Sequence, residues 1–356
     1  MKRIAVIDDG IYKCKETQSF VSQFLEFDST HKCFKEQHSF IRKFSHGTCC
    51  AMIIKKYCPV AEVVSLKILH QNMLIGSTEG LLYALTWCKN NDIDIVNLSL
   101  GTTNIYDFKS IQNTVNELIK NKTLIVAAVC NDFQFTVPAI FENVIGIASI
   151  TKNNLSKTEL AFLGINIQAN SVHEIMVENQ KYITPDCNSY ATPYVVACLI
   201  NGYINLEEKT TFVNDAIYIT GYMFNQVQNG KIIIDFSKYN VNFTCNKKKY
   251  ISIGVKGKNP VGTDFVDDLI SENVPIAIIK NMSLIKKRDL GKMSHLIGCD
   301  VLIYGSHKEI NKADYVIIYT GNHIIIKKKI LFIWLKITII NENQLIKTLL
   351  KEIYGG

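Results

Sequence analysis

Ile4-Ala5-Val6-Ile7-Asp8-Asp9-Gly10 opens the chain with an apolar run that ends in two carboxylates and a glycine. A short apolar run that stops at a turn signal is typical of a strand buried on both faces, as in a parallel sheet. Gly10 permits a sharp turn there, because glycine accepts backbone angles that other residues avoid. We therefore predict a buried parallel strand that presents Asp8 at its carboxyl end.

Four similar runs follow within the first 150 residues, and segments with helical periodicity lie between them. The expected strands are residues 63–69, 93–100, 123–128 and 144–148, and the expected helices are residues 77–90 and 108–120. Strands that alternate with helices favour an α/β fold with a doubly wound parallel sheet. In such sheets, functional groups gather at the carboxyl ends of the strands.

The composition of the chain excludes disordered and fibrous classes of protein. Of its 356 residues, 47% are hydrophobic and 20% are charged, so there is enough apolar surface for one or two cores. The most apolar region, residues 324–340, is interrupted by four lysines, which a membrane span does not tolerate. We expect a compact protein without a membrane segment.

The N-terminus and the cysteines predict a cytoplasmic location. The apolar run before Asp8 is too short for a secretion signal. The 11 cysteines are odd in number and contain no C-x-x-C pair. They indicate reduced thiols rather than a disulfide framework or a zinc site, so no metal is expected.

Charge divides the chain into two predicted domains. Residues 241–356 contain 18 Lys and Arg against 10 Asp and Glu, a net charge of +8, whereas residues 1–240 contain 21 against 22, a net charge of −1. The polar segment 241–250 has weak apolar periodicity and three consecutive lysines, so we interpret it as a linker. The prediction is one domain at residues 1–240 and a smaller basic α/β domain at residues 251–356.

The predicted second domain repeats the alternation of strands and helices. Its expected strands are residues 251–255, 275–279, 301–304, 315–319 and 330–340, and its expected helices are residues 264–272 and 343–354. The segment 257–263 (GKNPVGT) is similar to a phosphate-binding loop but lacks the lysine after its second glycine, which favours a plain turn. The lysines show no aromatic-basic RNA motif, so we expect a solvated basic surface and no nucleic-acid partner. A nucleotide-dependent regulator remains an alternative for this domain.

Three local patterns in the first domain carry residues with catalytic chemistry. Asp8 ends the first strand, His46 lies in the first turn of a predicted helix, and Ser189 begins a buried helix whose opening turn is expected to hold Pro193. A serine hydroxyl needs a base within hydrogen-bond reach, and the base needs a third group to orient it. Taken singly, each residue is more often a turn, capping or polar surface residue. Together they supply a nucleophile, a base and an orienting acid.

The segments around these residues, AVIDDG at 5–10, SHGT at 45–48 and NSYATP at 188–193, resemble in that order the active-site segments of subtilisin-like serine peptidases, the subtilases. Residues 96–101 resemble the family's substrate-binding strand, and residues 125–132 resemble the segment with its oxyanion-hole asparagine. Residues 229–235 are similar to the strand that closes the subtilase domain. The resemblance covers roughly the first two-thirds of the chain and implies a subtilisin-like sheet.

The resemblance implies a role for each matching residue. Asp8 orients His46, His46 acts as general base and then general acid, and Ser189 attacks the scissile carbonyl. Asn131 and the backbone N–H of Ser189 donate to the oxyanion. The edge Leu98-Ser99-Leu100-Gly101 binds an extended peptide by strand addition.

Three residues depart from the family pattern. The chain has Cys130 and Cys187 where the family usually has glycine, and Asn188 where it usually has threonine. Glycine is favoured where the backbone takes a positive φ or approaches a ligand closely, so we expect these side chains to narrow the cleft or alter the oxyanion geometry. A catalytically silent subtilase fold that binds peptides is therefore the alternative to an enzyme.

The resemblance implies a serine endopeptidase that forms an acyl-enzyme and needs no cofactor. A structural calcium ion stays open, because the family's calcium loops are not identified in the sequence. The expected partner is a peptide or protein substrate, with no membrane, and the oligomeric state stays open. A cytoplasmic location suggests selective cleavage, for instance of the leader of a ribosomally made peptide, rather than nutrient digestion.

Overall fold

The computed structural model of the chain describes most residues up to Ile204 and a series of helices and strands after it. The described residues are 2–71, 73–150, 157–204, 211–213, 217–219, 227–228, 231–235, 250–256, 264–272, 274–280, 287–297, 299–304, 313–320, 324–330, 333–339 and 342–354. The chain divides into two compact units. The first comprises Met1–Thr103 and Ser110–Asn225, and the second comprises Asn104–Lys109 and Gln226–Gly356.

A ten-stranded sheet organises the first unit, and it is parallel from β8 through to β2. Its order is β11 (Thr211–Val213), β12 (Ile217–Ile219), β8 (Ile165–Ala169), β7 (Ile145–Ser149), β6 (Leu124–Ala128), β5 (Ile95–Leu98), β1 (Arg3–Asp8), β4 (Glu62–Lys67), β2 (Val21–Asp28) and β3 (Cys33–Glu36). The strands at its two ends are added in antiparallel pairs. The doubly wound parallel sheet predicted from the sequence is confirmed, and the five predicted strands of this unit all form.

β1 lies in the middle of the sheet because it is apolar on both faces. Residues Ile4 to Ile7 are at most 1% exposed. β1 pairs in parallel with β4 on one side and with β5 on the other. The strand order therefore reverses at β1, and open α/β sheets bind their ligands at the carboxyl ends of strands next to such a reversal. Asp8 lies at this position.

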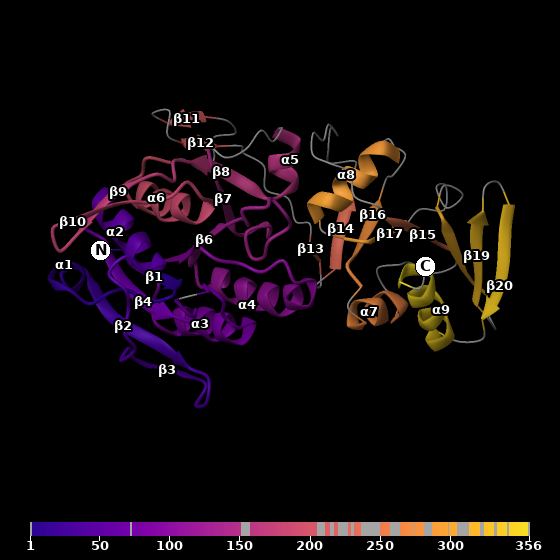
Figure 1. Cartoon of the computed structure of the whole chain (residues 1–356), viewed down its shortest axis with the longest axis horizontal. Coiled ribbons are helices and arrows are strands. Elements are labelled where there is room, and N and C mark those ends of the chain that lie inside the picture. Colours follow the sequence, from indigo (N-terminus) through magenta and orange to yellow (C-terminus); the bar gives the residue numbers. More distant parts are fainter. Residues whose placement is uncertain are drawn as a thin grey trace. The chain divides into compact units, whose positions relative to one another are not determined.

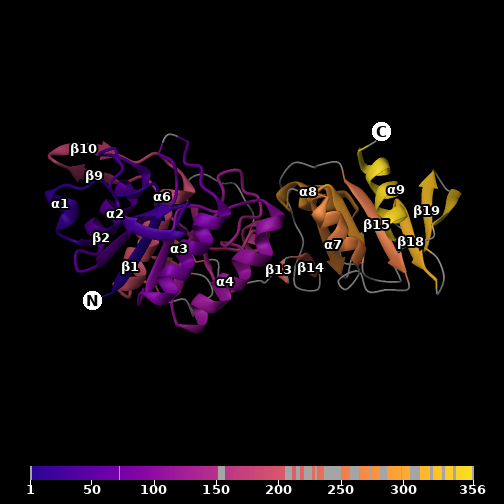
Figure 2. The same cartoon turned by 90° about the horizontal axis from the view of Figure 1, so that it is seen from below.

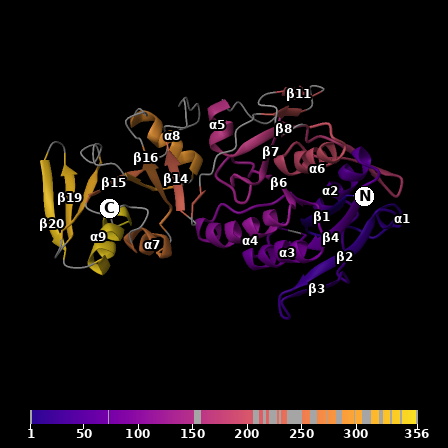
Figure 3. The ribbon, with the colours of Figure 1, turned by 180° about the vertical axis from the view of Figure 1, so that it is seen from behind.

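Two pairs of helices cover the two faces of this sheet, as Figures 1 and 3 show. α2 (His46–Tyr57) and α6 (Asn188–Ile200) lie on one face, and α3 (Thr78–Asn90) and α4 (Phe108–Lys120) lie on the other. Side chains of α2 and α6 share one core cluster with side chains of β1, β4, β5, β6, β7 and β8. The shorter elements up to Ile204 are α1 (Lys15–Gln18), η1 (Ile105–Asp107), α5 (Lys157–Phe162) and the hairpin of β9 (Glu174–Val177) and β10 (Gln180–Ile183).

Some strands of the first sheet escaped the sequence analysis because they contain polar residues. β2 mixes Ser22, Gln23 and Glu26 with apolar residues and is mostly half-buried or exposed. β8 is buried throughout, yet it contains Asn166 and Gln168. Asn166 accepts a hydrogen bond from the backbone of the neighbouring strand β7 at 2.7 Å, so a buried polar residue has a partner that the local sequence does not reveal.

The second unit has an eight-stranded sheet of its own. Its order is β13 (Val227–Gln228), β14 (Lys231–Asp235), β16 (Ile276–Lys280), β17 (Val301–Tyr304), β15 (Ile251–Lys256), β18 (Tyr315–Tyr319), β19 (Ile324–Ile330) and β20 (Ile333–Ile339). The strands from β14 to β18 are parallel, and β19 and β20 add to them as an antiparallel hairpin. Figure 2 shows this sheet with its helices α7 (Asp264–Ser271), α8 (Lys287–Ile297) and α9 (Glu342–Tyr354).

Two boundaries differ from the sequence prediction. β14 falls in the segment expected to close the first domain, but it pairs with β16, so the division lies near residue 226 rather than at residue 240. The strand expected at residues 330–340 is divided between two strands, because Ile330 ends β19 and Ile333 begins β20, and the two strands pair antiparallel. Residues 241–249 of the expected linker and the loop 257–263 lie outside the described residues. In the described part of the chain, every helix is too short or too polar to cross a membrane.

Gly47 sets how closely α2 approaches the end of β1, and we predict that Gly47→Ala destabilises the first unit. A Cβ atom at this position would lie 2.7 Å from the carbonyl oxygen of Gly10 and 3.1 Å from Cβ of Asp8. Because backbone atoms yield less readily than a flexible side chain, we expect the free energy of unfolding to fall by about 1–3 kcal/mol. Urea denaturation measures the change.

Gly80→Ala in α3 is the matched control for this variant. The nearest atoms to a Cβ at Gly80 lie at 3.3 Å or more, and alanine is the better helix former. We expect this variant to change stability much less. An equal loss in both variants would contradict a specific role for the close approach at Gly47.

Candidate active site

Asp8, His46 and Ser189 meet at the carboxyl edge of the first sheet. Nδ1 of His46 lies 2.9 Å from Oδ1 and 2.8 Å from Oδ2 of Asp8. Nε2 of the same ring lies 2.9 Å from Oγ of Ser189. When the ring carries its proton on Nδ1 and donates it to Asp8, Nε2 accepts the hydroxyl proton of Ser189. The structure thus brings together the three residues that the sequence analysis selected.

The first turn of α2 holds His46 through hydrogen bonds to its backbone. Ser45 is the N-cap, and its Oγ accepts the N–H of Thr48 at 3.1 Å. Asp9 accepts the N–H of Gly47 at 2.8 Å and that of His46 at 3.3 Å. The N–H groups of a first helical turn have no partner within the helix, so the end of β1 and the N-cap together fix where α2 begins.

Ser189 is the second residue of α6, and Pro193 changes the hydrogen bonding around it. A proline has no N–H, so the carbonyl of Ser189, four residues earlier, lacks its usual helical partner. The hydroxyl of Ser99 donates to that carbonyl at 2.8 Å instead. Pro193 is the sixth residue of α6 and not part of the opening turn, so this expectation from the sequence is wrong. The missing helical bond is replaced by a bond that ties α6 to the end of β5.

The hydroxyl of Ser99 links β5, α2 and α6 by hydrogen bonds in the interior of the protein. Ser99 is only 8% exposed. Nδ2 of Asn97 donates to its Oγ at 3.1 Å, and Sγ of Cys50 donates to the same atom at 3.4 Å. Ser99 therefore uses its hydroxyl for structure, and what it can offer a substrate is its backbone.

Asn188, the first residue of α6, is hydrogen-bonded to Asn131 and to the residues just before it. Oδ1 of Asn131 accepts the backbone N–H of Asn188 at 3.1 Å, so the amide N–H groups of Asn131 remain available for another acceptor. The side chain of Asn188 is buried and accepts the N–H of Ser149 at 2.8 Å. Its Nδ2 donates to the carbonyls of the two residues before Asn131, at 3.2 and 3.1 Å. Asn188 thus holds the segment 129–131 against the start of α6.

A cleft of about 270 Å³ adjoins His46 and Ser189. Its lining includes His46, Ser189, Asn131 and three residues of the edge expected to bind substrate, Ser99, Leu100 and Gly101. Leu98, the fourth residue of that edge, is fully buried and belongs to the core instead. Beyond Gly101 the edge is occupied by a bridge between Thr102 and Val137. The open part of the edge is therefore short.

The backbone at the two replaced glycines is not strained. Cys187 has φ −154° and ψ 157°, an extended conformation that any residue adopts. Cys130 is not among the residues with positive φ, and its Sγ accepts the N–H of Gln134 at 3.2 Å. Neither position therefore needs a backbone conformation that only glycine adopts readily. Sγ of Cys187, however, lies 3.0 Å from Oγ of Ser189, so this thiol contacts the serine hydroxyl directly.

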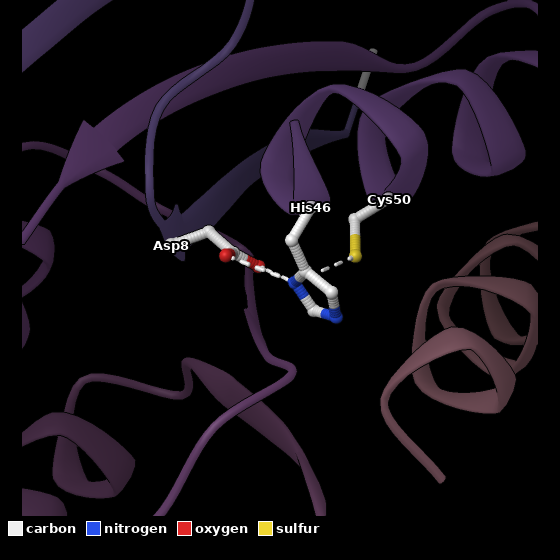
Figure 4. A group of neighbouring side chains, drawn as sticks. All are labelled: Asp8, His46 and Cys50. Atoms are coloured by element: carbon white, nitrogen blue, oxygen red, sulfur yellow. Dashed lines mark hydrogen bonds and ion pairs between the residues drawn. The ribbon is translucent and has the colours of Figure 1, made fainter. Parts of the chain in front are cut away.

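Cys50 is a neighbour of the imidazole that the sequence analysis missed (Figure 4). It lies one turn after His46 on α2, and its Sγ is 3.9 Å from Nδ1. Asp8, His46 and Cys50 are the residues of the described chain whose metal-type ligand atoms lie within 4.8 Å of one another. Burial raises the pKa of Cys50, which keeps its thiol protonated, whereas metals bind the thiolate. The i, i+4 spacing on a helix is the sequence signal that indicates this contact.

The carboxylate of Asp8 decides the charge of His46. Burial acts to lower the pKa of His46, but the adjacent Asp8 carboxylate raises it, and the net result is well above the usual value. His173 is also buried, and there burial lowers the pKa to about 4. His46 therefore holds a proton more readily than His173, because a carboxylate faces its ring.

Comparison with known proteins matches residues 2–284 to the model of the subtilase family. The chain is 30% identical over 215 residues to minor extracellular protease Epr of Bacillus subtilis, which covers 55% of this chain and 31% of that protein. It is 24% identical over 242 residues to a thermostable alkaline protease of Halalkalibacterium halodurans, which covers 61% of this chain and 62% of that protein. A solved cold adapted subtilisin-like serine proteinase is similar with a TM-score of 0.47 and 18% identity, covering 62% of this chain and 88% of that chain. The chain thus spans about a third of the length of the first of these curated relatives and somewhat under two thirds of the second.

We predict that Asp8 keeps His46 protonated beyond the usual histidine range. In NMR titrations of the histidine ring protons, His46 should titrate well above pH 6.5, whereas His173 should titrate at about pH 4. Asp8→Asn removes the anion and should lower the pKa of His46 while leaving that of His173 in place. A His46 titration that does not respond to Asp8→Asn would contradict this assignment.

Proposed function

The chain belongs to the subtilase family, and we propose that it is a serine endopeptidase that cleaves peptide bonds through an acyl-enzyme on Ser189. The observation that carries the proposal is the continuous line of hydrogen bonds from Asp8 through His46 to Oγ of Ser189. Such a line gives a weak nucleophile a base within reach and gives that base a fixed tautomer.

In the proposed first step, Oγ of Ser189 attacks the scissile carbonyl carbon and its proton passes to Nε2 of His46. The imidazolium that forms is stabilised by Asp8, which stays ionised. The negative oxygen of the tetrahedral intermediate accepts from Nδ2 of Asn131 and from the backbone N–H of Ser189. Two features support these donors: Asn131 bonds only its amide oxygen to Asn188, and the N–H of the second residue of a helix has no helical partner.

In the following steps, the intermediate collapses and the C–N bond breaks as His46 returns the proton to the leaving amine. A water molecule then loses its proton to His46 and attacks the ester carbon, which releases the carboxylic acid and restores the hydroxyl of Ser189. The proton taken from Ser189 thus leaves with the amine, and a proton from water, passed on by His46, restores the hydroxyl of Ser189. The chain supplies every acid and base that the cycle needs.

The proposed substrate is a peptide or protein segment in extended conformation. Leu100 and Gly101 line the cleft next to Ser189, which supports pairing of their backbone with an added strand. Leu69 and Leu74 also line the cleft, which favours apolar side chains next to the scissile bond.

A narrower proposal is that cleavage is selective, for instance for the leader segment of a ribosomally made peptide. The short open edge, which ends at the bridge between Thr102 and Val137, supports selectivity because it limits how many substrate residues can pair there. The net charge of +8 over residues 241–356 offers an acidic segment of a substrate a second surface.

We also propose a cytoplasmic location. None of the ten cysteines in the described part of the chain forms a disulfide. Three of them, Cys50, Cys130 and Cys187, lie at or beside the reacting groups. Free thiols at such positions persist in a reducing compartment, whereas oxidising compartments favour their pairing.

A fluorophosphonate probe tests the proposed activity without knowledge of the substrate. We expect wild-type protein to be labelled on Ser189, and labelling to disappear in Ser189→Ala. Asn131→Ala should slow labelling by about a hundred- to a thousand-fold, the size of the effect known for one oxyanion donor in subtilisin. Because Asn131 is exposed, this variant should keep its fold. A folded wild-type chain that resists the probe would instead support a peptide-binding module without catalysis.

Unfolded casein tests the narrower proposal of selectivity. We expect the purified chain to cleave casein slowly and at few positions, because few segments fit a short, apolar cleft. Mass spectrometry of the products counts the cleavage sites, and a probe-labelled sample is the control for contaminating peptidases. Rapid cleavage at many unrelated positions would contradict selectivity and leave the peptidase activity itself intact.

A further inference from the structure

We propose that Asp9 is a positioning residue for the catalytic base: its carboxylate fixes the first turn of α2 and adds a second negative charge beside His46. The inference rests on the proposed function, because it gives a role in the reaction to a residue that the catalytic steps leave unused. Asp9 directly follows Asp8 at the end of β1 and is 1% exposed.

Asp9 binds the two backbone N–H groups that set the position of the imidazole. One oxygen accepts from Gly47 at 2.8 Å, and the other accepts from His46 itself at 3.3 Å. Oγ of the N-cap Ser45 accepts a different N–H, that of Thr48. Because β1 also supplies Asp8, one strand end holds both the ring of His46 and the backbone that carries the ring.

The same contacts exclude two simpler roles for Asp9. Its oxygens are turned toward the start of α2, and it is not among the described residues that line the cleft, so it is not placed to bind substrate. A helix cap alone does not require a carboxylate here, because Ser45 already caps α2. A buried charge next to another buried carboxylate is costly, and it persists only where it interacts with other groups.

The electrostatic consequence follows from the position of the charge. Burial and the repulsion from Asp8 raise the pKa of Asp9 to about 6, while the N–H of Gly47 and the charge of His46 act to lower it. The attraction is mutual: if the imidazolium favours ionised Asp9, then ionised Asp9 favours the imidazolium. Asp9 therefore makes His46 a stronger base and stabilises the charge that His46 gains in the transition state.

Other ionisable groups around this pair come from several elements. They are Asp8 on β1, Lys67 on β4, Cys49 and Cys50 on α2, Tyr182 on β10, Cys187 at the N-cap of α6, and Tyr190 on α6. Burial raises the pKa of Cys49, Cys50, Tyr182 and Tyr190, so these groups stay neutral where His46 titrates. Asp8 and Asp9 are thus the anions that act on the imidazole.

The test is the pH dependence of fluorophosphonate labelling in the full chain. Labelling requires neutral His46, so its rate rises with pH through the pKa of His46. In Asp9→Asn the second anion is lost, and we expect the midpoint of this rise to move down by about one pH unit. We also expect the rate at high pH to fall about tenfold, because the Asn side chain offers one acceptor oxygen to two N–H groups.

Asp94→Asn is the matched control. The Asp94 carboxylate lies beside the opposite end of β1, where it accepts the N–H of Arg3 and forms an ion pair of 2.7 Å with Nζ of Lys2. This variant should leave the midpoint in place. Asp9→Ser is a second variant for the case in which Asp9→Asn does not fold, since serine is smaller and its hydroxyl accepts helix N–H groups. It should show the same downward shift.

The outcomes separate the proposals. An unchanged midpoint in a folded Asp9 variant would overturn the inference, and so would failure of both Asp9 variants to fold, which would assign Asp9 to stability alone. Absence of labelling in the wild type would instead count against the proposed peptidase activity.

Discussion

The packing of α2 against α6 is the constraint on which the whole site depends. His46 is the first residue of one helix and Ser189 the second residue of the other, and the two lie 143 positions apart in the sequence. Their hydrogen bond of 2.9 Å forms only because both helices cover the same face of the sheet and share one core cluster. The apolar side chains of that cluster therefore determine the distance across which a proton can pass.

Backbone hydrogen bonds make this arrangement specific. The start of α2 is held by Ser45 and Asp9, and the start of α6 is held by Ser99 and Asn131. Each of these side chains satisfies a backbone group that the helix itself leaves unpaired, and leaving such groups buried without partners would cost stability. His46 and Ser189 thus lie where two helix ends need hydrogen-bond partners. Three of those partners, Asp9, Ser99 and Asn131, lie just after strands of the sheet.

Local patterns in the sequence were enough to predict the central parallel strands and the three residues that meet in the site. Apolar runs show buried strands directly, and the three motifs lie at strand and helix ends that a parallel sheet brings together. Tertiary partners were not predictable in this way. The bond from Ser99 to the Ser189 carbonyl, the burial of Leu98 and the pairing of β14 with β16 all depend on neighbours distant in the sequence.

A burst experiment with p-nitrophenyl acetate tests most directly whether this geometry makes Ser189 a nucleophile. The account predicts rapid release of one nitrophenol per chain and an acetyl group on Ser189, located by peptide mass mapping. Cys187, whose thiol lies 3.0 Å from the same oxygen, is the informative competitor. A folded chain that gives no burst, or that carries the acetyl group on Cys187, would contradict the account.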